Sequence, residues 1–126
     1  IFFNILNTGK VQLDTESSST LGHVLASSAD PLSAGQWYQV AGVARASNLQ
    51  VYVDEQAGTP TNYSGLYPLV TGDNSYYGKR MNVGAWTYSS PTPSSVFNGL
   101  IDDVRVYNRA LTTAQIQAMY NAGRLR

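Results

Sequence analysis

The sequence predicts an all-β fold, a two-sheet antiparallel jelly-roll sandwich that ends in a short helix. Apolar and polar residues alternate in several short segments, as they do in half-buried strands, and turn-forming residues separate these segments. About nine or ten such segments fit into the chain, which is the pattern of a β-sandwich. The chain has 126 residues, the length of one domain, and we expect a single domain over residues 1–126.

The first half of the chain contains the clearest strand signals. Strands are predicted at residues 1–6, 10–14, 20–26, 36–45 and 49–54. A short polar connection at 46–48 joins the last two segments, so they are expected to form a hairpin. In the second segment of this pair, Leu49, Val51 and Val53 share one face, which predicts that this face is buried.

The second half is expected to contain loops, two more strands and a helix. Residues 55–80 are rich in loop-forming types with room for one or two short strands, and further strands are predicted at 81–86 and 96–107. In the longest of these, alternation assigns one set to the core, namely Leu100, Asp102, Val104 and Val106.

The closing helix has a defined start and stop. Thr112 is an N-cap candidate with Gln115 three residues later, which is the spacing of a capping box. Gly123 is suited to the helix stop. The apolar stripe expected to pack on the core is Ile116, Met119 and Tyr120.

Composition excludes several classes of function. Charged residues make up 13% of the chain, about half the usual share, and the formal net charge is zero. Because there is no basic stripe, we expect no nucleic-acid partner, and no apolar run approaches the roughly 20 residues of a membrane span. The chain has no cysteine, which excludes disulfides and zinc–thiolate sites.

A surface rich in Ser, Thr and Tyr favours a location outside the cell, on a cell surface or on a virion. The chain begins at Ile1 rather than Met, so a processed or excised domain is expected.

Three segments resemble the laminin-G-like domains of the concanavalin A-like lectin/glucanase type. Residues 97–111, FNGLIDDVRVYNRAL, match the C-terminal signature of these domains, and residues 35–41 and 49–54 resemble two of their internal strands. Glu55 stands where the family usually has Gly, so that turn must differ, and the N-terminal side is short for the family. The resemblance implies a jelly-roll fold; its members include lectins, carbohydrate-binding modules, adhesion domains, and structural proteins of surfaces and viruses.

The carboxylates argue against an enzyme. Glycoside hydrolysis needs two carboxylates that flank the scissile bond, but the only glutamates are Glu16 and Glu55, far apart in sequence. Asp102 and Asp103 are adjacent, and successive strand residues point to opposite faces. The sequence therefore predicts no catalytic residues.

A calcium site is the one cofactor that the residues suggest. A carboxylate on the core face, as predicted for Asp102, must be satisfied by hydrogen bonds or by a cation. Backbone hydrogen bonds that fix the neighbouring turn are one reading, and calcium, which prefers oxygen ligands, is the other. Laminin-G-like domains often bind calcium, as the resemblance implies. Asp73, in an oxygen-rich loop, is the second candidate ligand.

The ligand-binding prediction rests on aromatic side chains in the loop-rich region. Tyr and Trp combine a flat apolar face with a polar tip, which suits sugar rings and also protein partners, while Asp and Asn can bind sugar hydroxyls. The predicted ligand-binding residues are Tyr63, Tyr67, Asp73, Asn74, Tyr76, Tyr77, Trp86 and Tyr88.

Two functions from different classes remain open. The first is a non-catalytic extracellular module that recognises carbohydrate through the aromatic loops. The second is a structural or decoration subunit of an extracellular filament, capsid or surface layer that assembles through sheet edges and the aromatic loops, in which Ile1–Leu6 could add to a sheet edge of a neighbouring subunit. The zero net charge is compatible with self-association, because it removes electrostatic repulsion between copies.

Overall fold

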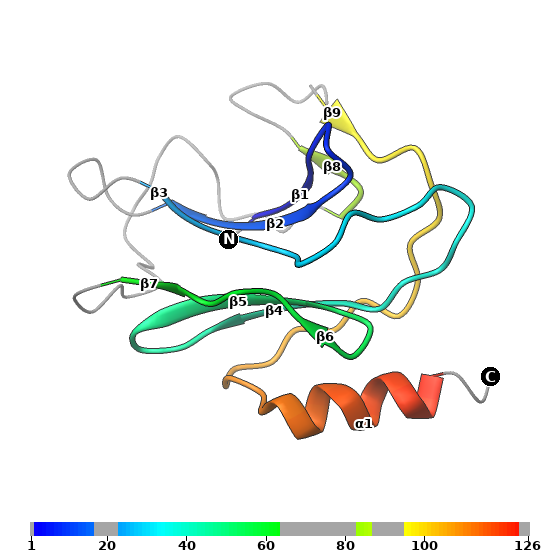
Figure 1. Cartoon of the computed structure of the whole chain (residues 1–126). Helices are drawn as coiled ribbons and strands as arrows, with labels where there is room; N and C mark the ends of the chain where they lie inside the picture. The colour runs from blue at the N-terminus through cyan, green and yellow to red at the C-terminus, as the bar shows by residue number, and fades with distance from the viewer. Residues whose placement is uncertain (1, 17–22, 64–82, 87–94, 124–126) are drawn as a thin grey trace. The chain divides into compact units, whose positions relative to one another are not determined.

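A computed structural model describes residues 2–16, 23–63, 83–86 and 95–123, which form antiparallel sheets and one C-terminal helix (Figure 1). The predicted fold class is therefore confirmed. The chain divides into two compact units, one made of Ile1–Val70 with Tyr107–Arg126 and the other of Thr71–Val106. We call them unit 1 and unit 2 and describe each by itself. The expectation of a single domain over residues 1–126 stays a prediction.

Unit 1 begins with a three-stranded antiparallel sheet, called sheet A here. Its strands are β1 (Phe2–Ile5), β2 (Val11–Glu16) and β3 (His23–Ser27), in the order β1-β2-β3. Phe3 lies opposite Leu13 in the β1–β2 ladder, so the first strand of the chain pairs within its own unit. Gly9 has a φ of +80°, a left-handed conformation that glycine adopts without steric cost, in the turn that joins β1 to β2.

The second sheet of unit 1, called sheet B, contains the predicted hairpin. Its strands are β4 (Val40–Ala44), β5 (Asn48–Val53), β6 (Gln56–Ala57) and β7 (Thr61–Asn62), where β5 pairs with all three others. Ala44 lies opposite Leu49, which confirms the hairpin around residues 45–47, although β4 is shorter than the predicted strand at 36–45.

The turn between β5 and β6 shows how this chain manages without the expected glycine. Asp54 and Glu55 form the turn, and Asp54 carries the positive φ, +55°. Aspartate tolerates this conformation better than most residues because its short polar side chain can bond locally. Here Oδ1 of Asp54 accepts a hydrogen bond from the backbone N–H of Gln39 at 2.9 Å, and the Asp54 N–H donates to the Gln39 carbonyl at 2.7 Å.

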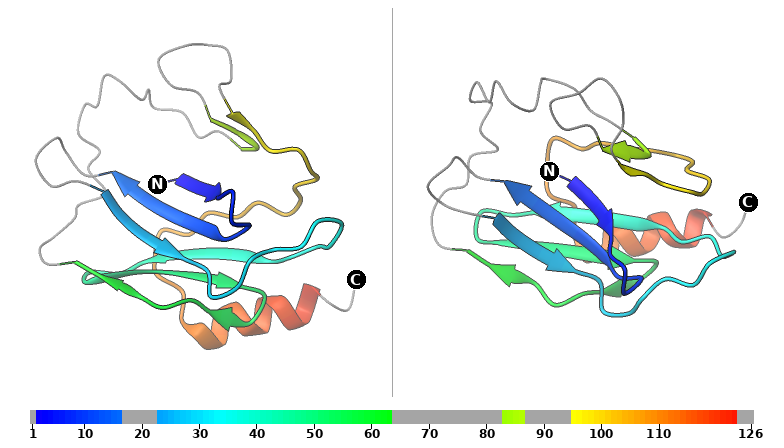
Figure 2. Two further views of the ribbon diagram at one scale, coloured as in Figure 1. Left: turned by 45° about the horizontal axis from the view of Figure 1, so that its top comes forward. Right: turned by 90° about the horizontal axis from the view of Figure 1, so that it is seen from above.

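The main core of unit 1 lies between sheets A and B, which stack as two layers (Figures 1 and 2). The predicted apolar face of β5 contributes to it, since Leu49 and Val51 are buried and Val53 packs against them. The buried residues of this core are Val11, Leu13, Val24, Ala26, Leu49 and Val51.

The opposite face of β5 is covered as well. Helix α1 (Thr113–Gly123) packs there through Ile116, which forms a second buried cluster with Val43, Tyr52 and Leu111. The predicted capping box is confirmed, because the Gln115 N–H donates to Thr112 Oγ1 at 3.2 Å and the Thr112 N–H donates to Gln115 Oε1 at 3.0 Å. Strand β5 is therefore buried on both faces.

Unit 2 contains a short antiparallel pair, β8 (Ala85–Trp86) and β9 (Ser95–Val96). The prediction of a long strand over 96–107 was wrong: β9 ends at Val96, and residues 97–107 form no strand. Asp103 has a φ of +52°, and its N–H is bound by the Asp102 carboxylate at 2.7 Å. This local turn breaks the extended backbone that the alternation of apolar residues suggested.

Candidate functional site

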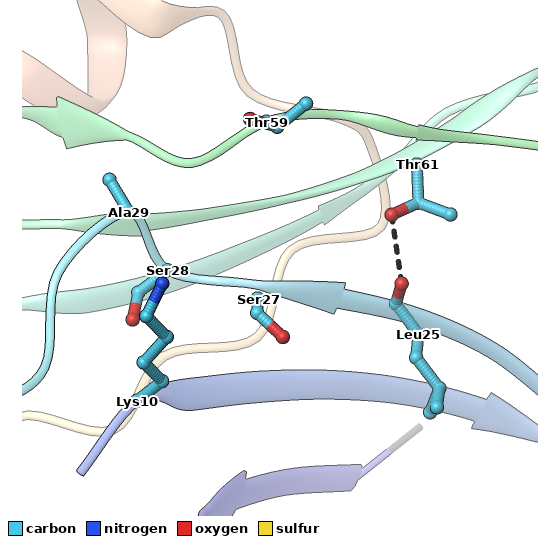
Figure 3. A pocket seen from close by; sticks show the side chains of 7 residues that line it. All are labelled: Lys10, Leu25, Ser27, Ser28, Ala29, Thr59 and Thr61. Carbon is cyan, nitrogen blue, oxygen red and sulfur yellow. Dashed lines mark hydrogen bonds between the residues drawn. The ribbon is translucent and has the colours of Figure 1, made fainter. Parts of the chain in front are cut away.

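An open pocket of about 340 Å³ lies in unit 1 at the margin where sheet A meets sheet B (Figure 3). Leu25 and Ser27 of β3, one of the two edge strands of sheet A, line one side of it, and Thr61 of β7 lines the other. The full lining comprises Lys10, Leu25, Ser27, Ser28, Ala29, Thr59 and Thr61.

A side-chain hydrogen bond and a buried glycine hold the two sides of the pocket together. Thr61 Oγ1 donates to the Leu25 carbonyl at 2.8 Å and so ties β7 to β3. Gly58 precedes Thr59 and is buried; a Cβ at this position would collide with the carbonyl oxygen of Ser27 and lie 3.2 Å from that of Val51. The close approach of the two sheets at the pocket therefore depends on a glycine at position 58.

The hydroxyl groups of the pocket fall into two kinds. Ser28 Oγ, in a side chain that is 3% exposed, accepts from the Val11 N–H at 3.1 Å and donates to the Asp30 carbonyl at 2.7 Å. Ser28 and Thr61 have thus already used their single donor hydrogen within the protein. In the described part of the chain, the hydroxyls of Ser27 and Thr59 form no hydrogen bond and keep their donor available.

Lys10 brings the one charge of the pocket. Lys10 immediately precedes β2, and its side chain extends toward Ser28 (Figure 3). The seven lining residues, all described, include no carboxylate, and within the described residues Lys10 forms no ion pair. The pocket is therefore a small hydroxyl-lined site with one ammonium group at its edge.

Most of the predicted aromatic ligand site lies outside the described residues. This holds for Tyr67, Asp73, Asn74, Tyr76, Tyr77 and Tyr88. Trp86 is placed in β8, where it pairs with Ser95. The assignment of these residues to ligand binding stays a prediction.

Tyr63 is the member of the predicted site whose surroundings are described. Its half-buried ring packs against the core between the sheets, and its hydroxyl donates to the carbonyl of Arg45. Its N–H donates to the Ser47 carbonyl at 2.9 Å. Both bonds reach the β4–β5 hairpin turn, so Tyr63 braces that turn.

Asp102, the other predicted calcium ligand, does not lie in the core. Its side chain is exposed, and Oδ1 accepts the N–H of Asp103, which corrects the core assignment made from the alternating pattern. Asp103 in turn forms an exposed ion pair with Arg105, two residues later in the chain, at 2.7 Å. The described residues contain no group of three or more side chains suited to a metal, and Asp73 lies outside them, so calcium stays a prediction.

Sequence reasoning missed the pocket and one exposed aromatic ring. The pocket residues are common Ser, Thr and Lys types that come from separate segments, and no spacing in the sequence connects them. Trp37 is 66% exposed in the loop before β4. The signal in the sequence was Gly35, two residues before Trp37, because glycine favours turns and loops. In the structure Gly35 has a φ of +77°.

Comparison with known proteins gives a family and one solved structure. A laminin G model described as the Concanavalin A-like lectin/glucanases superfamily matches residues 1–117. No curated protein matches the chain. The chain is similar to a crystal structure of an S-layer domain-containing protein from Clostridium thermocellum, with 23% identity and a TM-score of 0.57.

The similarity to that structure covers 89% of this chain and 52% of the other, so this chain spans about half of that protein's solved length. At this identity the likeness concerns the fold alone. No helix in the described part of the chain has the length and apolar character of a bilayer span. Because the family model covers nearly the whole chain, and its fold agrees with the paired sheets described above, the protein belongs to the concanavalin A-like lectin/glucanase superfamily.

Proposed function

We propose that this chain is a non-catalytic extracellular binding module that recognises carbohydrate. The observation that carries this proposal is the hydroxyl-lined pocket between β3 and β7, on a fold whose family includes lectins. Ser27 and Thr59 offer free hydroxyl donors. Thr61 Oγ1 keeps its acceptor lone pairs, and Ser28 Oγ keeps the one that the Val11 N–H does not use. Sugar hydroxyls both donate and accept hydrogen bonds, so a lining of this kind complements them.

The superfamily also includes glucanases, so the absence of catalysis is part of the proposal. The support is the distribution of carboxylates. Glu55 lies exposed in the β5–β6 turn, and the other glutamate, Glu16, is at the end of β2. The two glutamates are 39 positions apart along the chain. Incubation with β-glucans should release no new reducing ends, and release of reducing ends that Glu55→Gln abolishes would overturn this part.

The location at a cell or virion surface is supported by composition and by one comparison. The chain is low in charge and rich in Ser, Thr and Tyr. The similar solved structure carries an S-layer domain in its name, which fits a surface protein.

The experiment for carbohydrate recognition is a glycan panel read by retention of the full chain. Two separate sites are tested in parallel: the aromatic region by Trp86→Ala and Tyr77→Ala, and the pocket by Thr59→Val with Ser27→Ala. Loss of glycan retention by the variants of one site, with an unchanged melting temperature, supports the proposal and identifies that site as the binding site. A chain that no glycan retains, with and without calcium, would overturn it.

A second candidate function is a structural or decoration subunit of an extracellular filament, capsid or surface layer. The observation that favours it is the place of β1 at the edge of sheet A, where β2 occupies one side of the strand. An edge strand is a template for pairing with another chain. Phe3 and Ile5 on this strand are about half exposed, 50% and 48%.

Light scattering after size exclusion separates the two functions. A binding module should elute as a monomer near 13.7 kDa, and an assembly subunit as a large species that persists on dilution. Removal of residues 1–6 should block assembly while the rest of the chain stays folded. Assembly by the truncated chain would exclude the β1 edge as the contact.

A further inference from the structure

We infer that the pocket between β3 and β7 selects sugars that carry an acidic group, a carboxylate or a sulfate, and that Lys10 binds this group. This inference rests on the proposed carbohydrate function and makes its ligand class specific. The hydrogen-bonding capacity, the charge and the size of the pocket support it.

The hydrogen-bond capacity of the pocket is weighted toward donors. Ser27 and Thr59 each keep a free hydroxyl hydrogen, and the Lys10 ammonium adds up to three more. Ser28 and Thr61 donate elsewhere in the protein, so they can only accept. A ligand group made solely of acceptor oxygens satisfies the donors of Ser27, Thr59 and Lys10 together, and carboxylates and sulfates are such groups.

The charge of the pocket points in the same direction. Lys10 is half-buried, and the described lining residues offer it no carboxylate partner. Asp30 is the acidic residue nearest in sequence to the lining residue Ala29, and it is exposed. Its backbone carbonyl, not its carboxylate, accepts the hydrogen bond from Ser28 Oγ. An anion that enters the pocket therefore gains a charge-assisted hydrogen bond without displacing an existing ion pair.

The remaining lining residues suit the rest of a sugar. Ser28 and Thr61 present acceptor lone pairs to ring hydroxyls, and Leu25 and Ala29 supply small apolar surfaces. The volume of about 340 Å³ is near the lower end of the range for ligand pockets, roughly 300–1,000 Å³. A pocket of this size accommodates a small ligand such as one sugar unit, while the open side leaves room for the sugars that continue a chain.

The test is an NMR titration of the isotope-labelled full chain with matched small probes. Glucuronate and glucose 6-sulfate carry the acidic group on a sugar, glucose is the neutral counterpart, and sodium acetate and sodium sulfate carry the acidic group alone. Glucuronate or glucose 6-sulfate should shift the amide signals of the pocket residues, namely Lys10, Ser27, Ser28, Thr59 and Thr61. Their affinity should be at least about tenfold above that of glucose. Added salt should weaken the binding of these acidic sugars.

The affinities of two charge-removing variants for the acidic sugars test the role of Lys10 independently. Lys10→Met should weaken binding of the acidic sugars about tenfold or more, because it removes the charged donor but keeps an unbranched side chain. Arg105→Met removes an equal charge from an exposed side chain outside the pocket and should leave the affinity unchanged. Equal losses in both variants would reveal a general charge effect and overturn the role of Lys10.

The outcomes distinguish this inference from the proposed function. Glucose binding as tightly as glucuronate and glucose 6-sulfate, or sugar-induced shifts confined to other residues, would overturn the inference and leave a carbohydrate-binding module. Acetate or sulfate binding as tightly as the acidic sugars would reduce the pocket to an anion site and also overturn it. Absence of shifts with all three sugars, together with failure in the glycan panel, would overturn both.

Discussion

The hydroxyl of Tyr52, near the end of β5, lies 3.0 Å from Oγ1 of Thr113, the first residue of helix α1, although the two residues are 61 positions apart in sequence. Tyr52 is fully buried, and its hydroxyl donates to Gln50 Oε1 at 2.9 Å. Because a tyrosine hydroxyl has one hydrogen, Thr113 must be the donor in their bond. Arg45 completes the cluster by donating to the Tyr52 hydroxyl at 3.3 Å and to the Leu111 carbonyl at 3.4 Å.

This cluster fixes where α1 sits on sheet B, and Tyr52→Phe tests its contribution. The substitution keeps the ring in the apolar cluster and removes the oxygen that Gln50, Thr113 and Arg45 share. We expect the free energy of unfolding to fall by about 1–3 kcal/mol, because buried partners lose a hydrogen bond. Urea titration followed by circular dichroism measures it. Tyr38→Phe, which removes a single exposed bond to the Ser33 N–H, is the control and should have a smaller effect.

The capping box predicts a second stability difference. Thr112→Ala removes the oxygen that accepts the Gln115 N–H, and should lower the free energy of unfolding by about 0.5–2 kcal/mol. Thr112→Ser keeps the oxygen and should stay close to the parent chain. Equal stability of the alanine and serine variants in urea would show that the cap contributes nothing to the fold.

These two features differ in how far the sequence predicts them. The capping box follows from Thr112 and Gln115 three positions apart, since a local spacing fixes a local geometry. The faces of β5 follow from strand alternation, but the sequence gives no sign that Tyr52, on the supposed outer face, is buried beneath a helix. That burial depends on where α1 returns, which is a long-range contact.

Residues 97–107 and the pocket show where pattern reasoning fails. Alternation predicted a strand over residues 96–107. In the structure the Asp102 carboxylate accepts a hydrogen bond from the Asp103 N–H, and Asp103 has a positive φ that interrupts the extended backbone. Short polar side chains compete with strand pairing in this way, and periodicity takes no account of it. The pocket could not be predicted for a different reason: Lys10, Ser27 and Thr59 are brought together only by the packing of sheet A on sheet B.

Calcium binding makes a prediction that does not depend on the pocket. If Asp73 and Asp102 hold calcium, removal of the ion with a chelator should lower the melting temperature, and added calcium should restore it, because a ligand that binds the folded state stabilises it. Asp102→Asn should abolish the response. Thermal melting with and without chelator measures the effect, and identical curves would exclude a stabilising calcium site at both residues.

Gly58→Ala tests the close approach of the two sheets, on which the pocket depends. The added Cβ would collide with the backbone carbonyl of Ser27, and backbone atoms cannot move aside as a flexible side chain can. The connection between β6 and β7, which contains Gly58, must then shift away from β3. This shift would weaken the hydrogen bonds that Gly58 makes, namely its N–H to the Val51 carbonyl at 2.8 Å and its carbonyl to Gln50 Nε2 at 2.9 Å.

We expect this substitution to lower the free energy of unfolding by about 1–3 kcal/mol, as overpacking of a tight interior does. Gly123→Ala is the matched control, because a Cβ there meets nothing within 4 Å, and it should be neutral or slightly stabilising. Urea titration compares the two variants. If Gly58→Ala were as stable as Gly123→Ala, sheets A and B could separate at this margin without cost, and the pocket would lack the rigid wall that selective binding requires.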